Sequence, residues 1–199
     1  MRANRPAGSE HKETSMQLRD NGLRFSPLTV VLHWTVAILL IAIVGLGLAM
    51  SQTGDSVQQA EWARVQHLLV AILFVVSVYR FWARVTSYHP LPAGTPNPVE
   101  VIVSRSIAVT LALAMVLLPI AAWLTKAAAG EAVSLPGGWT IPAPIGPGTS
   151  AHRVFAFLFE LGATAFTAGL ALHLFGALKN HFVMKNDTLK RMLGKHLEL

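Results

Sequence analysis

Histidine is the residue type in this chain best suited to redox or metal chemistry. The 199 residues include eight histidines and no cysteine, which excludes thiolate metal sites, iron–sulfur clusters and covalent haem attachment. The segment from His152 to His181 shows most clearly why a chemical role for the histidines must be considered. It is strongly apolar, yet it has one histidine at its start, a second at His173 in its interior and a third at its end. Ionisable side chains in such apolar segments commonly have a function.

Four apolar runs must position these histidines. Each is long enough to cross about 30 Å of hydrocarbon, which takes roughly 20 helical residues. The runs comprise residues 28–50, 65–85, 106–125 and 151–178. The chain is 53% hydrophobic and only 13% charged, which is too apolar for an ordinary soluble domain. We therefore expect an all-α integral membrane protein, a four-helix bundle in up-down-up-down order within the lipid bilayer.

The distribution of basic residues predicts the orientation of these helices. Of the 16 lysines and arginines, five lie in the N-terminal tail, three in the second connection and five in the C-terminal tail, which leaves Arg64, Lys126 and Arg153 for the other two connections. Because cytoplasmic loops are enriched in positive charge, both termini are predicted to be cytoplasmic. Membrane topology thus accounts for the formal charge of +6. No basic face is interleaved with aromatic residues, so no nucleic-acid partner is expected.

One domain is expected, with a tail at each end. Residues 1–24 lack apolar periodicity and are predicted to form a mobile cytoplasmic tail, residues 25–193 the bundle, and residues 194–199 a C-terminal tail. Nothing at the start resembles a cleaved signal peptide. Prolines and glycines predict a non-helical loop at residues 86–100 and a non-helical cap on the outer face at residues 126–150.

Depth in the membrane sorts four histidines into two pairs. At a rise of about 1.5 Å per residue, His33 lies roughly 8 Å inside the first run, and His173 lies about 9 Å from the cytoplasmic end of the fourth. His67 and His152 both lie close to the outer boundary. A b-type haem needs two neutral imidazoles from facing helices and no covalent bond to the protein. The sequence therefore predicts one histidine pair near each face.

Other interpretations stay open for several of these residues. An intramembrane histidine can instead hydrogen-bond a neighbouring helix, and His67 and His152 could be ordinary interfacial residues. Arg80, Lys179 and His181 are candidates for contacting a haem propionate or a quinone headgroup, with topology anchoring as the alternative for the two cations. Glycines at positions 45, 47, 162 and 169 would let helices or a porphyrin approach closely.

Three stretches of the chain resemble the bacterial cytochrome b561 family: RFSPLTVVLHW in the first run, VYRFWARV in the second and HLFGALKNHFVMKNDTLKRML at the end. The resemblance extends from Arg24 to Leu193. It implies a di-haem, four-helix cytochrome of the bacterial inner membrane that exchanges electrons with the quinone pool. Some members give the electron of superoxide to ubiquinone. Carried over by motif, His33 and His173 would ligate the haem on the cytoplasmic side.

The outer site departs from the family pattern. The family places its other fourth-helix ligand about four turns before the position of His173, and that position is Phe159. His152 lies seven residues earlier, about 700° around the helix and hence on nearly the same face, so it could substitute. His67 is one residue out of register with the second-helix ligand. Two haems b are therefore expected, with a one-haem protein as the alternative.

The predicted function is electron transfer through bis-histidine haem b to or from the quinone pool, with superoxide:ubiquinone oxidoreductase as one form of it. The electron donor is not specified by the sequence. A haem-containing membrane anchor for a separate dehydrogenase or reductase is the first alternative. A haem-free transporter or assembly protein, in which the histidines only bridge helices, is the second.

Overall fold

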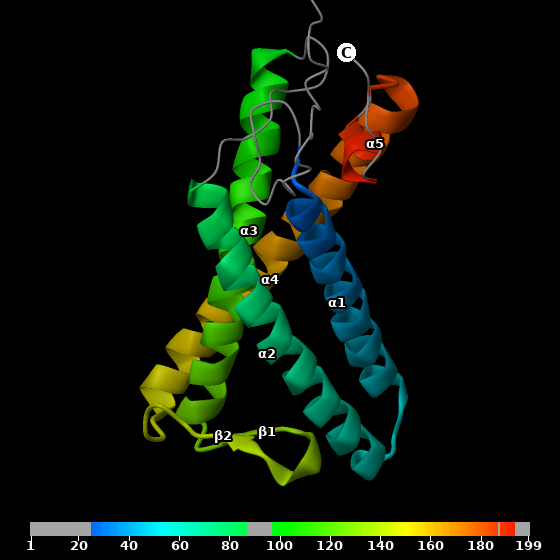
Figure 1. Cartoon of the computed structure of the whole chain (residues 1–199). Coiled ribbons are helices and arrows are strands. Elements are labelled where there is room, and N and C mark those ends of the chain that lie inside the picture. The colour runs from blue at the N-terminus through cyan, green and yellow to red at the C-terminus, as the bar shows by residue number, and fades with distance from the viewer. Residues whose placement is uncertain (1–24, 87–96, 187, 194–199) are drawn as a thin grey trace, which may run out of the picture.

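Four long helices in antiparallel order make up the bundle (Figure 1). They are α1 (Pro27–Gln52), α2 (Ser56–Thr86), α3 (Pro98–Ala128) and α4 (Thr149–Leu178). A computed structural model describes residues 25–86, 97–186 and 188–193. The tails predicted at residues 1–24 and 194–199, and most of the predicted loop at residues 86–100, lie outside the described residues.

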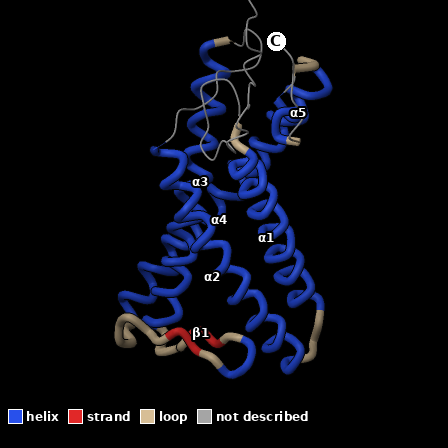
Figure 2. The backbone as a smooth tube through the Cα atoms, viewed as in Figure 1, coloured by secondary structure: helices blue, strands red, loops and turns tan. Residues whose placement is uncertain are grey.

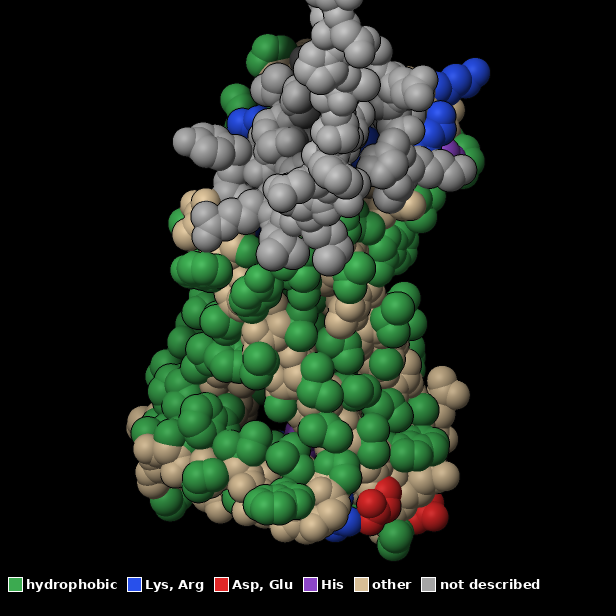
Figure 3. Space-filling view, viewed as in Figure 1, with side chains coloured by type: hydrophobic (Ala, Val, Ile, Leu, Met, Phe, Trp, Pro, Cys, Tyr) green, Lys and Arg blue, Asp and Glu red, His purple; other side chains and the backbone are tan. Residues whose placement is uncertain are grey.

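Each of the four helices is long and apolar enough to cross a membrane. Their outward faces carry many exposed large hydrophobic side chains, which cover the middle of the molecule in Figure 3. Such a surface suits lipid and would be unstable in water. The predicted all-α membrane bundle is confirmed.

The helices extend beyond the predicted apolar runs. α2 begins nine residues earlier than predicted, where the Asp55 carboxylate accepts the backbone N–H of Val57 at 2.9 Å. α3 begins eight residues earlier, because the Asn97 side chain accepts the N–H of Val99 at 2.9 Å and Pro98 occupies the first turn. Both are favourable helix starts. The prediction of a non-helical loop at residues 86–100 is therefore wrong at Thr86, which ends α2, and from Pro98 onward.

A small hairpin closes the bundle at the end where α3 leads into α4. Strands β1 (Val133–Ser134) and β2 (Thr140–Ile141) are antiparallel and are joined through one 3-10 turn, η1 (Pro136–Gly138). We call this the hairpin end, at the bottom of Figure 1, and the opposite end the terminal end. The cap predicted to be non-helical over residues 126–150 is present between the helices, apart from the short η1 turn. The prediction is wrong at both of its ends, because Lys126–Ala128 still belong to α3 and Thr149 and Ser150 already belong to α4.

The helices associate mainly as two pairs, α1 with α2 and α3 with α4, and α2 joins the pairs by packing on α3. Figure 2 shows the two pairs diverging along their length. In the first pair, the Gln66 carboxamide donates to the backbone carbonyl of Ile43 at 2.9 Å. An added Cβ at Gly47 would lie 3.3 Å from that Gln66 nitrogen, so a glycine suits this contact.

The second pair depends on a glycine at the contact between α3 and α4. An added Cβ at Gly162 would lie 2.9 Å from Leu118 Cδ2, whereas one at Gly45 would meet nothing within 4 Å. We expect Gly162→Leu to lower the free energy of unfolding by about 1–3 kcal/mol, since a leucine there forces the helices apart. Gly45→Leu is the matched control, because both changes give the same gain in helix propensity.

Thermal unfolding in detergent, followed by circular dichroism at 222 nm, measures this difference. Equal midpoints for the Gly162→Leu and Gly45→Leu proteins would contradict close packing at Gly162.

Candidate metal centre

Two histidines face each other at the terminal end of the bundle. His33 lies in the second turn of α1 and His173 in the penultimate turn of α4, so they come from helices of opposite direction. Their ring centroids are 6.3 Å apart with an interplanar angle of 55°. Both side chains are half-buried. The structure therefore brings together the pair that the sequence predicted from depth.

The separation of the two rings can be compared with what an axial pair requires. An imidazole nitrogen binds a metal at about 2 Å, and two such bonds with half of each ring amount to about 6 Å between ring centres. The observed 6.3 Å between His33 and His173 agrees with this value. The residues present thus fit a bis-histidine haem b in donor type, number and spacing.

Arg80 contacts this pair from α2. One of its terminal nitrogens lies 2.9 Å from Nδ1 of His33. A guanidinium can only donate, so Nδ1 of His33 is the acceptor in this contact. Arg80 is half-buried between the helices, which places a positive charge directly beside the two imidazoles.

A buried hydroxyl lies one helical turn from Arg80. Ser77 is only 2% exposed, and its Oγ is the one buried side-chain polar atom without a hydrogen-bond partner among the described residues. Ser77 and Arg80 are three positions apart, so they lie on the same face of α2. The sequence analysis did not single out Ser77, although its position three residues before Arg80 predicts that both lie on one face of the helix.

The C-terminal part of the described chain packs beside His33. Trp34 stands edge-on to the His33 ring at 5.7 Å, and its indole N–H donates to the backbone carbonyl of Met192 at 2.8 Å. Met192 ends the short helix α5 (Thr188–Met192). This contact ties α5 to α1 next to the histidine pair.

The other candidates at the terminal end lie where α4 ends in a π-helical turn, η2 (Lys179–Val183). Lys179 forms an ion pair with Glu100 of α3 at 2.8 Å. His181 is half-buried and stands edge-on to Phe182 at 4.8 Å. The structure thus gives Lys179 a protein partner that sequence analysis missed, and π-helical turns of this kind are frequent at functional sites.

At the hairpin end, two histidines are each held by a backbone carbonyl. Nδ1 of His67 lies 3.0 Å from the carbonyl oxygen of Ser134 in β1, and Nδ1 of His152 lies 3.1 Å from that of Thr125 in α3. A carbonyl only accepts, so each Nδ1 donates in its contact, and a neutral imidazole held in this way keeps the lone pair on Nε2. This is the arrangement usual for a metal-binding histidine.

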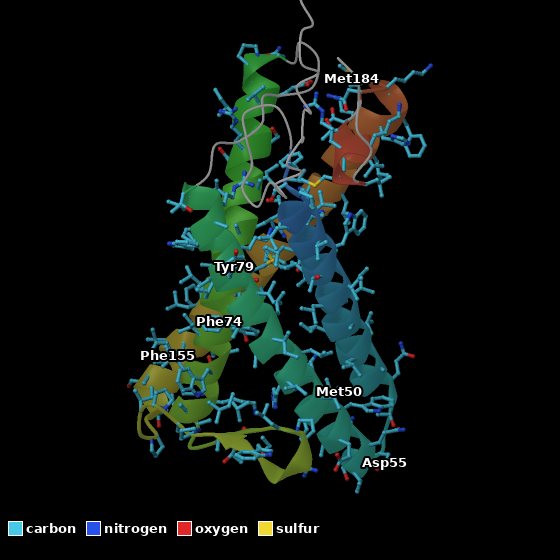
Figure 4. The ribbon with its side chains drawn as sticks, viewed as in Figure 1. Met50, Asp55, Phe74, Tyr79, Phe155 and Met184 are labelled. Atoms are coloured by element: carbon cyan, nitrogen blue, oxygen red, sulfur yellow. The ribbon has the colours of Figure 1, made fainter. Side chains whose placement is uncertain are left out.

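The second pair is less closely associated than the first. Ring contacts within the described residues include His33 with His173 but none between His67 and His152. Figure 3 shows a hollow near the hairpin end with a histidine side chain inside it. In Figure 4, Asp55 marks this end of the bundle and Met184 the opposite end. Phe159 is half-buried, as His152 is.

Charges also gather around His152. The Lys126 ammonium donates to the Glu131 carboxylate at 2.9 Å. This hydrogen bond, with the attraction of the ammonium, lowers the pKa of Glu131 from its ordinary value, and nearby His152 lowers that pKa further. Glu131 therefore stays ionised to lower pH than a free glutamate.

Four apolar helices with two histidines facing each other across one end are features of a membrane cytochrome of the helix-bundle class. A family model described as prokaryotic cytochrome b561 matches residues 24–195. Cytochrome b561 homolog 2 of Escherichia coli is 31% identical over 174 residues, which cover 86% of this chain and 92% of that protein. The chain belongs to the prokaryotic cytochrome b561 family. It is thus a multi-pass membrane b-type cytochrome of electron transfer, and the family implies haem b.

Proposed function

We propose that this protein transfers electrons through bis-histidine haem b between a donor at the hairpin end and the quinone pool at the terminal end. The observation that supports it most directly is the 6.3 Å separation of the His33 and His173 rings. In this proposal the termini are cytoplasmic and the protein lies in the bacterial inner membrane, as the distribution of lysine and arginine favours.

The residues at the terminal end have distinct roles in this proposal. His33 and His173 hold the iron, and haem b when bound supplies one-electron exchange between the ferric and ferrous states. Arg80 offers a planar fork of donors that matches a carboxylate, so its proposed partner is a haem propionate. Lys179 and His181 face the cytoplasmic boundary and are proposed to contact the quinone headgroup.

At the hairpin end, His67 and His152 are proposed to hold a second haem. Their Nδ1 atoms donate to fixed carbonyls, which orients each ring and leaves Nε2 for a metal. In this proposal His152 replaces the ligand that the family places at the position of Phe159. Two sites near opposite ends would carry an electron across the bilayer.

The visible spectrum of the purified protein tests this function. We expect the absorption of a low-spin b haem that appears on reduction with dithionite, and the same change on addition of a ubiquinol analogue. A preparation from haem-supplied cells with no reducible haem signal would refute the proposal.

Two further measurements distinguish a superoxide-oxidising cytochrome from a haem-containing anchor subunit. Reduction by superoxide, abolished by added superoxide dismutase, would identify superoxide as the donor. A haem that dithionite reduces but quinol does not would instead indicate an anchor subunit that needs a separate dehydrogenase.

A further inference from the structure

Glu160 is an acidic side chain on the outward face of α4. It lies eleven residues after Thr149, the first residue of that helix, so its depth is about 16 Å from the helix start. The side chain is exposed, and no hydrogen bond or ion pair holds it within the described part of the chain. Acidic residues in membrane-spanning helices almost always face other protein or a water-filled cavity, because hydrocarbon cannot hydrogen-bond them. Glu160 therefore needs a partner from outside its own chain.

Two contacts of α4 define the direction in which Glu160 points. Gly162 faces α3, and His173 faces His33 of α1. At about 100° of rotation per residue, Glu160 lies roughly 160° around the helix from Gly162 and roughly 140° from His173. The carboxyl group is therefore directed away from both neighbouring helices, into the lipid that would surround a single copy.

A continuous stripe of exposed residues runs through Glu160 along α4. Its positions alternate in spacing between four and three residues, which keeps them on one side of the helix and is the spacing of left-handed helix pairs. We call this stripe the α4 seam, and its members are Arg153, Phe157, Glu160, Thr164, Thr167, Ala171, Leu174 and Leu178. None of the residues of α4 is buried, whereas each of the other three long helices has buried residues. α4 is therefore the long helix least covered by its own chain.

The middle of the α4 seam differs from the lipid-facing surface of α1. It consists of Glu160, Thr164, Thr167 and Ala171, whereas the exposed face of α1 has large aliphatic side chains such as Ile41. Interfaces between membrane helices are enriched in small and hydroxylated residues, which let the backbones approach closely. Each of the two threonine hydroxyls donates to the backbone carbonyl four residues before it, at 2.8 Å. Both can therefore pack against a second helix without an unsatisfied hydrogen.

A second copy of this chain is the partner that fits Glu160. In hydrocarbon a carboxyl group costs least in its neutral form, which has one O–H donor and an acceptor oxygen. Two such groups satisfy each other. Because all copies insert in the same orientation, a two-fold axis along the membrane normal brings residues of equal depth together. The α4 seam is then its own complement, as such a two-fold interface requires.

We propose that the α4 seam is the interface of a parallel homodimer, in which Glu160 of each chain is hydrogen-bonded to Glu160 of the partner subunit. The His33 and His173 pair lies on another side of α4, so each chain keeps its own candidate metal centre. This inference does not depend on the proposed function, because no residue of the seam is a proposed haem or quinone ligand.

Cysteine cross-linking in native membranes tests the position of the interface. The chain contains no cysteine, so a single introduced cysteine reports on one position. Ala171→Cys lies in the seam, and the matched control is Leu172→Cys, an exposed neighbour about 100° around the helix. We expect oxidation to convert the Ala171→Cys protein to a species of twice the chain mass, and the Leu172→Cys protein to remain monomeric. Absence of a dimer, equal cross-linking of both positions, or cross-linking only to another protein would overturn the proposal.

The role of the carboxyl group is tested by sedimentation equilibrium of the full-length protein in density-matched detergent. Glu160→Ala removes the hydrogen-bonding group, and we expect the dissociation constant of the dimer to rise about tenfold. Glu160→Gln should stay close to the wild type, because its carboxamide both donates and accepts. The control is Leu161→Ala, which truncates an exposed side chain beside the seam at the same depth.

The folding of the Glu160→Ala protein is measured in parallel. Its haem content and its circular dichroism at 222 nm should equal those of the wild type, so that a weaker dimer reports on the interface alone. A dissociation constant unchanged in Glu160→Ala, or raised equally by Leu161→Ala, would overturn the proposal.

Discussion

Replacement of His33 or His173 by alanine is expected to remove one haem per polypeptide. A six-coordinate site does not persist without one of its imidazoles, and the 6.3 Å between these rings leaves room for the iron and its two bonds. Pyridine haemochrome, normalised to protein, measures the loss. Each single substitution should have the full effect, because the two residues act as one site.

His181→Ala is the matched control for this experiment. His181 is a histidine of the same end of the bundle, in η2, and is not proposed to ligate iron. It should retain the wild-type haem content. Free imidazole added to the His33→Ala protein should restore part of the lost signal. Full haem content in either His33→Ala or His173→Ala would refute the pairing.

Replacement of His152 by alanine is expected to reduce the haem content from two per polypeptide to one. The remaining haem should have the spectrum that is lost in His33→Ala, since the two sites lie at opposite ends of the bundle. His67→Ala should give the same result. A wild type that contains one haem, unchanged by His152→Ala, would show that the hairpin end holds none.

A compensating variant makes this second prediction sharper. Phe159 is half-buried seven residues from His152 and lies on nearly the same face of α4. The double change of His152→Ala with Phe159→His moves the imidazole to the position that the family uses. We expect it to recover more of the second haem than His152→Ala alone. Glu131→Gln is the control, since it alters the charge beside His152 but no proposed ligand.

The sequence predicted the bundle well because the membrane restricts the choices. Four apolar runs in lipid must be helices, and the rise per residue fixes the depth of each side chain. Depth alone was enough to pair His33 with His173. Helix starts such as Asn97 with Pro98 were missed because the apolar run was used as the boundary, although capping residues were present.

The surroundings of the candidate site were much less predictable. The partners of His67 and His152 are the backbone carbonyls of Ser134 and Thr125, and a carbonyl is present at every position whatever the residue type. Such contacts depend on how the hairpin folds back over the bundle. Ion pairs such as Lys179 with Glu100 depend likewise on which helices become neighbours.

The division of the bundle into two helix pairs has a consequence for biogenesis. Within the described residues, α1 packs on α2 and α4 on α3, and the extensive contact between the pairs is that of α2 with α3. A haem held by His33 of α1 and His173 of α4 would join the remaining edges. Because haem would bind only the bundle in which α1 and α4 are held together, the haem supply would set the fraction of chains in that form by mass action. In cells short of haem, a larger fraction of the chains should be sensitive to proteases, so haem availability would control the abundance of this protein after translation.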